Sequence, residues 1–514
     1  MDTATIIGVA TGAALGGILL WYWSKSSIPY PPGPKRIFSL GLVLELKRST
    51  AFWLNFAQLS KKYGPIMTVR MGHRTIFVVD DPSSAAYLFE KKAAQYSDRM
   101  VSELAKLGEW DRDIIFIEYG PTLKHYRTLL QRALNNRVAL DYLPIQEHEV
   151  KRMMRRLYET PDRFMDHVHL MSGSVAIRMV YGYKVDSAED PLVQSAEKVM
   201  SIFSDIMTPG KWMIESLPLL RFLPTWFPGA TFHQMVASSR PILQSYAQNT
   251  FDFVKSGLAK GTAEPSFTSK LLHSETGDEL TGEEELHIKR IASSLYGAAS
   301  DTTVSAVQSF FLAMTLYPEV QAKAQSEIRS YLEQNQGSPV QFVTMADRNQ
   351  LPYTSVLVRE LLRWHPVVNM TAHRSCGKDD DNVVIGEKVY RIPAYAIIGV
   401  NIWSMLHNPK VYPDPEKFIP ERHLGENPPP LPELYAFGFG RRICPGTHVA
   451  QQSMWLSISN ILANFTITKA KDENGLEIVP EERYTNQVIS HPMPFKCDIV
   501  PRNGLGRWLS EIGA

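Results

Sequence analysis

The spacing of hydrophobic positions changes along the chain and separates strand-like from helix-like segments. Apolar runs at 66–71 and 75–79, on either side of a glycine, predict a β-hairpin. From Asp81-Pro82, an N-cap followed by a first-turn proline, to about residue 330 the apolar spacing is that of helices. After Asn369 the pattern changes to short strands and proline-rich loops. We therefore expect a mainly α-helical fold with a small β-rich part.

The longest predicted helix begins at a capping box made by Thr281 and Glu284 and continues to Leu316. At the usual rise per residue it would be roughly 50 Å long and could cross a whole domain. Small residues occupy its middle, at 297–300, and would let a flat ligand lie close to the backbone. Asp301 follows directly, and an ionisable group inside such a helix is costly unless it is paired.

The N-terminal segment departs from ordinary globular composition. Residues 4–23 carry no charge and are about long enough to cross a bilayer as one helix. The run ends in three aromatic residues rather than in a small-residue cleavage site, and basic residues follow it, so the positive-inside rule places the remaining chain in the cytosol. We expect a membrane anchor at residues 1–25, a proline-rich spacer at 26–36 and the body of the protein at 37–514.

Composition and charge narrow the classes of function. Of 514 residues, 44% are hydrophobic and 21% are charged, which is ordinary for a globular protein. The formal net charge of +1 gives no basis for binding nucleic acid. The three cysteines are scattered, which argues against a disulfide framework and favours a reducing compartment. The length alone would suggest about three domains.

One of these cysteines, Cys444, stands in a segment suited to holding a metal. Gly440 and Gly446 flank it and permit a tight turn with close backbone approach. Because an apolar helical run follows, the helix dipole and unpaired N–H groups would stabilise its thiolate. The alternative is a buried structural cysteine on a glycine-rich loop. Several histidines lack this context and are not expected to replace Cys444 as the ligand: His125, His365, His407, His448 and His491.

The cysteine segment resembles the haem-binding signature of the cytochrome P-450 family. The residues that carry the resemblance are Phe437, Gly440, Arg442, Cys444 and Gly446. It implies the fold of that family, with haem b as cofactor and Cys444 as the proximal ligand of its iron. Phe437 would pack against the haem face, and Gly438 belongs to the same cofactor-binding segment. Because the implied haem contacts extend over residues 127–446, one large haem domain would replace the three that length suggests.

Asp301 and Thr302 resemble the oxygen-activation pair of the same family. In that pair the acid relays protons and the hydroxyl hydrogen-bonds dioxygen. Ala299 is a departure, because the family commonly has glycine there. The alternative is a surface aspartate beside a threonine whose hydroxyl bonds to its own helix.

Glu360 and Arg363 are spaced to share one helix face, which alone indicates only a solvated ion pair. Together with Arg422, in a later proline-rich loop, they resemble the Glu-Arg-Arg clamp of the P-450 family. The resemblance implies a buried ion network that pins the loop before Cys444 to the helical body. His423 stands where the family often has an aromatic residue.

The resemblance also implies cationic residues for the haem propionates. Arg127 occupies one such place, in a segment where Leu123 replaces the usual tryptophan. Arg374, preceded by His373, and Arg442 resemble the other two contacts. For any one of these arginines, the alternative is an ordinary surface position.

The substrate contacts implied by position are mostly apolar and suit a lipophilic or partly aromatic molecule. They are Phe116, Ile117, Ala298, Val367, Val368 and Ile489. The overall pattern resembles fungal members that act in secondary metabolism on terpenoid or aromatic scaffolds. Segment 207–227 is also rich in apolar residues and belongs either to the core or to a second membrane contact beside the substrate access route.

The expected activity is that of a monooxygenase, which inserts one oxygen atom from O2, usually as a hydroxylation. No flavin or nicotinamide fingerprint occurs in the sequence, so an NADPH-dependent reductase is implied as electron donor, with cytochrome b5 as a second candidate. The resemblance further implies a monomer that spans the endoplasmic reticulum membrane once, with its catalytic body in the cytosol. Two alternatives stay open. One is a reductase-independent haem-thiolate isomerase or dehydratase, against which Asp301 and Thr302 count; the other is a haem-binding gas sensor or carrier.

Overall fold

The computed structural model describes residues 28–34, 51–71, 74–208, 210–215, 217–273, 280–336, 342–377 and 379–511. Within these ranges, no helix combines the length and the apolar character that crossing a bilayer requires. The predicted anchor, residues 1–25, lies outside the described residues, as do the two ends of the predicted spacer. The boundaries at residues 25 and 36 therefore stay predictions.

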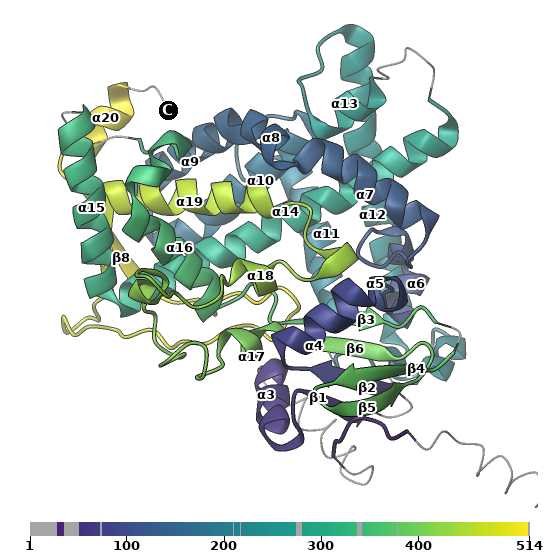
Figure 1. Cartoon of the computed structure of the whole chain (residues 1–514). Coiled ribbons are helices and arrows are strands. Elements are labelled where there is room, and N and C mark those ends of the chain that lie inside the picture. The colour runs from purple at the N-terminus through teal and green to yellow at the C-terminus, as the bar shows by residue number, and fades with distance from the viewer. Residues whose placement is uncertain are drawn as a thin grey trace, which may run out of the picture.

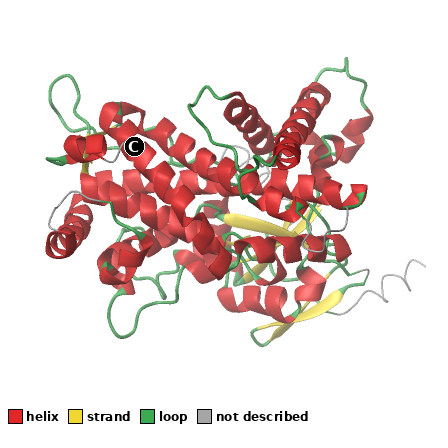
Figure 2. Ribbon diagram, turned by 90° about the horizontal axis from the view of Figure 1, so that it is seen from above, coloured by secondary structure: helices red, strands yellow, loops and turns green. Residues whose placement is uncertain are grey.

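Helices make up most of the described chain, as expected, and the larger strands gather on one side of it (Figures 1 and 2). The helices are α3 (Phe52–Tyr63), α4 (Pro82–Ala86), α5 (Ala93–Tyr96), α6 (Glu103–Leu107), α7 (Pro121–Leu134), α8 (Asn136–Ala139), α9 (Leu143–Glu159), α10 (Phe164–Tyr181), α11 (Pro191–Met207), α12 (Thr231–Lys260), α13 (Phe267–Leu272), α14 (Gly282–Leu316), α15 (Pro318–Gln336), α16 (Pro352–Trp364), α17 (Ile402–Leu406), α18 (Glu433–Ala436), α19 (Thr447–Asn464) and α20 (Leu505–Glu511).

The strands form one four-stranded sheet and two two-stranded antiparallel sheets among the described residues. They are β1 (Ile66–Met71), β2 (Arg74–Val79), β3 (Met370–Arg374), β4 (Asp381–Ile385), β5 (Lys388–Ile392), β6 (Ile397–Asn401), β7 (Phe465–Lys469) and β8 (Cys497–Pro501). The predicted hairpin is confirmed, because β1 and β2 pair antiparallel with Ile66 opposite Val79. The larger sheet has the order β1-β2-β6-β3, so it joins strands from both ends of the body.

The described part of the spacer, residues 28–34, lies against two strands. The N–H of Thr68 in β1 donates to the carbonyl of Pro32 at 2.8 Å, and the N–H of Arg391 in β5 donates to that of Pro29 at 2.9 Å. At Gly33 an added Cβ would meet the Thr68 carbonyl oxygen at 1.9 Å, so only glycine fits there. These contacts fix where the chain approaches the sheet.

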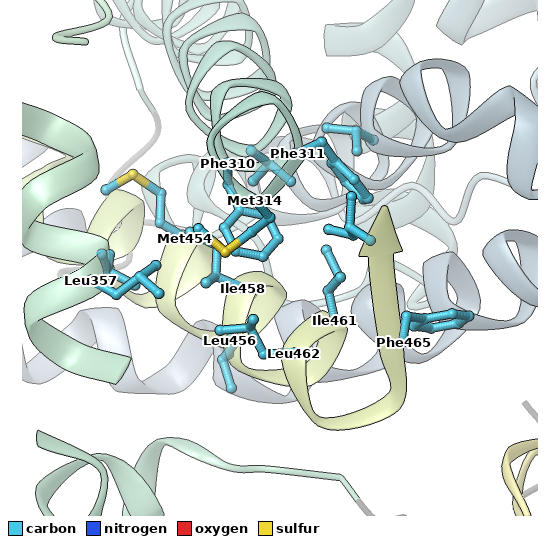
Figure 3. Close-up of a cluster of buried hydrophobic side chains, with 14 of the residues drawn as sticks. Phe310, Phe311, Met314, Leu357, Met454, Leu456, Ile458, Ile461, Leu462 and Phe465 are labelled. Carbon is cyan, nitrogen blue, oxygen red and sulfur yellow. The ribbon is translucent and has the colours of Figure 1, made fainter. Parts of the chain in front are cut away.

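Helix α14 runs through the middle of the helical part (Figure 1). The predicted capping box is confirmed: the Thr281 hydroxyl accepts from the Glu284 N–H at 3.2 Å, and the Glu284 carboxylate accepts from the Thr281 N–H at 2.8 Å. The largest core cluster lies beside this helix (Figure 3). There Phe310 and Met314 of α14 pack with Met454 and Ile458 of α19. This packing holds α14 and α19 in fixed positions. Helix α14 carries predicted site residues, and α19 begins directly after Cys444 and Gly446.

Candidate functional site

The segment before α19 folds as a tight loop that holds the partly buried Cys444. Gly438 and Gly440 have φ angles of 81° and 55°, which side chains rarely adopt. A Cβ added at Gly440 would lie 1.8 Å from the carbonyl oxygen of Phe89, so the loop can approach that residue only as glycine. The N–H of Cys444 donates to the carbonyl of Phe437 at 2.8 Å and closes the loop. Cys444 is thereby set just before the first turn of α19.

The surroundings of Cys444 act on its thiol in opposite directions. Burial raises its pKa above the ordinary value, whereas the N–H of Gly446, the charge of Arg127 and the hydroxyl of Thr447 lower it. The expected stabilisation at the helix start is therefore present but is outweighed by burial. A metal cation at the sulfur would favour the thiolate, because metal binding displaces the thiol proton.

The middle of α14 presents an open stripe of three predicted site residues. Ala298 is exposed although most of the surrounding helix is buried, and Asp301 and Thr302 follow one turn later on the same face. The Thr302 hydroxyl donates to the Ala298 carbonyl at 2.8 Å, the helix-bonded geometry considered above as an alternative. Its oxygen can still accept a hydrogen bond. Asp301 is not a surface residue, because only 15% of its side chain is exposed.

The structure brings the three predicted clamp residues together in the interior. Glu360 lies 2.9 Å from Arg363 and 3.1 Å from Arg422, and the side chains of Glu360 and Arg363 are fully buried. The other guanidinium nitrogens bond to backbone carbonyls between residues 406 and 417. The network therefore ties α16 to the loop that leads toward Cys444.

His423 is a fourth member of this network. Its Nε2 lies 2.8 Å from the Glu360 carboxylate. In the family that the sequence resembles, this position often holds an aromatic residue. Burial alone would raise the pKa of Glu360, but hydrogen bonds from His423, Arg363 and the Ile419 N–H, with the charge of Arg363, hold that pKa below its ordinary value. Glu360 is therefore ionised at neutral pH.

The predicted propionate contacts lie in two different environments. Arg127 of α7 donates to the Ile443 carbonyl at 2.7 Å, next to Cys444. Arg442 donates to the carbonyls of Ser97 and Ile114 at 2.8 and 3.2 Å, and burial, with Arg99 close by, lowers its pKa to about 9. Asp98 compensates part of the charge of these two arginines, and a further anion would stabilise them.

Arg374 is placed differently from the expectation. Its guanidinium pairs with Asp98 at 2.9 Å and with Glu118 at 2.5 Å, so two carboxylates of the protein already compensate its charge. Neighbouring residues of a strand point to opposite faces. His373 therefore points inward from β3 and is 2% exposed, whereas Arg374 points outward. This geometry favours His373 over Arg374 as a cofactor contact.

Arg99 and His373 carry the clearest signs of a missing anionic partner. Arg99 Nε and His373 Nδ1 are buried and have no hydrogen-bond partner among the described residues. Burial lowers the pKa of Arg99 to about 10 although the charge of Asp98 raises it. Burial also lowers the pKa of His373 well below its usual range, and the charges of Arg99 and Arg442 add to that shift. A dicarboxylate cofactor such as haem would supply the acceptors and negative charge that this group lacks. Sequence reasoning missed Arg99, because no spacing signal marks it.

The predicted substrate contacts lie on three segments around α14. Phe116 and Ile117 lie on a loop whose Ile114 N–H donates to the Ser294 hydroxyl of α14 at 3.4 Å. Val367 and Val368 follow α16, and the Val367 carbonyl accepts from the Ser490 N–H at 2.9 Å. This bond brings Ile489 to the same region. The role of these residues in binding substrate stays a prediction.

The comparisons with known proteins agree with this geometry. The family model described as cytochrome P-450 matches residues 31–498. Cytochrome P-450 monooxygenase claR of Ampulloclitocybe clavipes is 36% identical, and the alignment covers 99% of this chain and 92% of that protein. Cytochrome P-450 monooxygenase 208 of Postia placenta is 37% identical over 92% of this chain and 91% of its own. Monooxygenase ppsD of Aspergillus oryzae is 34% identical over 98% and 96%. The chain therefore belongs to the cytochrome P-450 family and is a P-450 monooxygenase.

Proposed function

We propose that this chain is a membrane-anchored haem-thiolate monooxygenase of lipophilic small molecules. The observation that carries the proposal is a loop-held cysteine close to two neighbouring arginines, Arg99 and Arg442, whose pKa values burial lowers and whose environment leaves Arg99 Nε without a hydrogen-bond partner among the described residues. When bound, haem would supply the chemistry that activates O2. The overall reaction is substrate plus O2, NADPH and one proton to hydroxylated product, NADP⁺ and water. Cys444 would hold the iron, and Arg99, Arg127, His373 and Arg442 would hold the propionates.

The protein's own part in this reaction is to bind, orient and protonate. Asp301 would bring protons to the stripe on α14, and Thr302 would accept and donate hydrogen bonds there. The clamp of Glu360, Arg363 and Arg422 takes no part in the chemistry but holds the loop before the cysteine.

Thr302→Ala should uncouple NADPH consumption from product formation. The loss of the hydroxyl removes a hydrogen-bonding group from the open stripe of α14, so more of the electrons should leave as hydrogen peroxide. Peroxide release per NADPH oxidised is the measurement. Thr303→Ala is the matched control, because its hydroxyl bonds to the Ala299 carbonyl at 3.2 Å and its side chain is buried. Full coupling in Thr302→Ala would remove Thr302 from the mechanism.

An exposed apolar surface supports the proposed membrane association. Within segment 207–227, Leu219, Phe222 and Trp226 are 79%, 71% and 78% exposed, whereas Ile214 is buried. Trp212, Leu220 and Leu223 also pack, half-buried, against the core cluster that contains Ile214. The segment therefore packs partly with the core and leaves other large apolar side chains outside. Large exposed apolar patches mark protein or membrane contacts. We propose that this surface lies in the membrane interface and adds a second membrane contact to the anchor proposed at residues 1–25, with the catalytic body on the cytosolic side of the endoplasmic reticulum.

The electron donor and the substrate class belong to the same proposal. An NADPH-dependent reductase would supply the electrons, with cytochrome b5 as a second donor, and the enzyme would act as a monomer. The apolar character of the predicted contacts supports a lipophilic substrate, such as a terpenoid or aromatic scaffold. The relatives named above come from fungi, which supports a role in fungal secondary metabolism.

Co-expression with a reductase tests the proposed function. Cells would be fed a panel of terpenoid and aromatic precursors under ¹⁸O2, and mass spectrometry would follow the label. We expect one labelled oxygen atom in a product whose formation requires NADPH. A product formed without NADPH would indicate an isomerase or dehydratase. Haem binding without turnover of any precursor would indicate a sensor or carrier.

A further inference from the structure

The carboxylate of Asp301 is paired with a histidine from the far end of the chain. Oδ1 of Asp301 lies 3.2 Å from Nε2 of His491, and each side chain is 15% exposed. This pairing offsets the free-energy cost of placing an ionisable group inside α14. It also puts a second proton-carrying group next to the residue that we propose as the proton donor.

Backbone bonds hold His491 in this position. The N–H of Thr485 donates to the His491 carbonyl at 2.8 Å, and the His491 N–H donates to the Thr485 hydroxyl at 3.0 Å. The neighbouring Ser490 carbonyl accepts from the Ser305 hydroxyl of α14 at 2.6 Å. Ser305 lies one helical turn after Asp301, so the turn at 485–491 is fastened to α14 beside the pair. The imidazole therefore approaches Asp301 from a fixed direction.

A second histidine links the pair to solvent. The ring of His169 in α10 lies nearly parallel to that of His491, at 17°, with 6.3 Å between the ring centroids. Solvent reaches the His169 side chain, and the Ser172 hydroxyl, one turn further along α10, donates to the Ser300 carbonyl at 2.7 Å. A row of three side chains therefore extends from the open stripe of α14 to the surface: Asp301, His491 and His169.

The charges around His169 show that the three groups interact. Packing of protein around the ring lowers the pKa of His169, Asp301 raises it, His491 lowers it, and Asp166 of α10 raises it. Two other titratable groups lie nearby. The charge of His491 lowers the pKa of His365, and the charges of Glu197 and Asp301 raise the pKa of Tyr296. His169 is therefore mainly neutral at pH 7 and can both accept and donate a hydrogen bond.

We propose that His491 positions Asp301 and passes protons to it. The N–H bond at Nε2 of protonated His491 breaks, an O–H bond forms on Asp301, and His491 becomes neutral. His491 then recovers a proton from bulk water through His169 and one intervening water molecule. This inference rests on the proposed function, because the protons are those that O2 reduction consumes. It assigns two further residues to the path, His491 and His169.

His491→Gln tests the path in the full-length holoenzyme with its reductase. The glutamine amide can still donate a hydrogen bond to Asp301 but cannot carry a proton. We expect the rate of NADPH-driven O2 consumption to fall about tenfold, below the range for complete loss of a general acid because water can partly replace the ring. The solvent deuterium isotope effect on that rate should rise. His148→Gln is the matched control, because His148 lies 3.8 Å from Glu149 on the surface.

A titration separates failure of the path from failure of the proposed function. Histidine ring signals of the reduced, CO-bound protein would be followed by NMR against pH. Asp301→Asn should lower the pKa of His169, and His491→Gln should raise it, because the charges of Asp301 and His491 act in these directions. If neither variant moves this pKa, or if His491→Gln keeps the wild-type rate and isotope effect, the inference is wrong.

Two further outcomes are informative in the same experiments. If the wild type consumes no O2 with NADPH and reductase, the proposed function fails, whereas the titration still decides whether the three groups interact. If the His491→Gln protein no longer gives the CO spectrum, its haem site is disturbed and His169→Gln becomes the test variant. Within the described part of the chain, His169 makes no bond that holds the turn at 485–491. His169→Gln should also slow O2 consumption and raise the isotope effect, and an unchanged rate would exclude the path.

Discussion

Glu360→Gln is expected to destabilise the protein by about 3–5 kcal/mol and to reduce the haem retained after purification. The substitution keeps the size of the side chain but removes its charge. The substitution would leave the fully buried Arg363, and Arg422, without a carboxylate counter-ion. An uncompensated buried charge is strongly destabilising. Because the network ties α16 to the loop before Cys444, the cofactor site should loosen with it. The measurements are the denaturation midpoint and haem absorbance per polypeptide.

A surface pair serves as the control for this variant. Glu481 lies 3.3 Å from Arg483, with both side chains largely exposed, so Glu481→Gln should leave the midpoint unchanged. The pH dependence gives a second check. Because the pKa of Glu360 is lower in the folded chain than in the unfolded chain, its stabilisation is complete at neutral pH and disappears as pH falls through the folded pKa. A Glu360→Gln protein with wild-type stability and haem content would show that the clamp is unimportant.

Asp301→Asn is expected to lower the rate of product formation by about 100-fold while the CO spectrum stays unchanged. The amide is similar in size and can still contact His491, but it cannot supply a proton. The substitution should therefore affect proton delivery and leave cofactor binding intact. Product formation and NADPH oxidation would be measured side by side with the reductase present.

Asp205→Asn is the matched control for the Asp301 variant. Asp205 pairs with Lys211 at 2.6 Å on the surface and lies outside the proposed path, so activity should be unaffected. An Asp301→Asn protein that forms product at the wild-type rate would exclude Asp301 as the proton donor. It would also remove the basis for the role of His491.

The elements that local sequence determines were predictable. The capping box at Thr281 and the helix to Leu316 depend on contacts within a few residues, and both occur as expected. The hairpin at β1 and β2 was predictable from alternation and a glycine turn. The P-450 family was predictable from the resemblance of the spacing around Cys444, and Gly440 in that spacing is required because the loop passes close to Phe89.

The parts that depend on tertiary placement were not predictable in this way. A run of residues does not show which face of β3 turns inward, so Arg374 was chosen where the structure favours His373. Arg99 belongs to the cationic group only because the fold brings it near Arg442. The pairing of Asp301 with His491 joins α14 to a turn near the C-terminal end, and no periodicity relates the two.

The CO spectrum of the reduced protein, compared between wild type and Cys444→Ser, tests the central claim of thiolate ligation most directly. Sulfur ligation predicts a red-shifted Soret band in the full-length wild type and its absence in Cys444→Ser. Cys376→Ser is the control and should keep the band, because the Cys376 thiol donates to the Ala94 carbonyl and lies outside the loop at 437–446. A wild type without the shifted band, or a Cys444→Ser protein that retains it, would contradict the account.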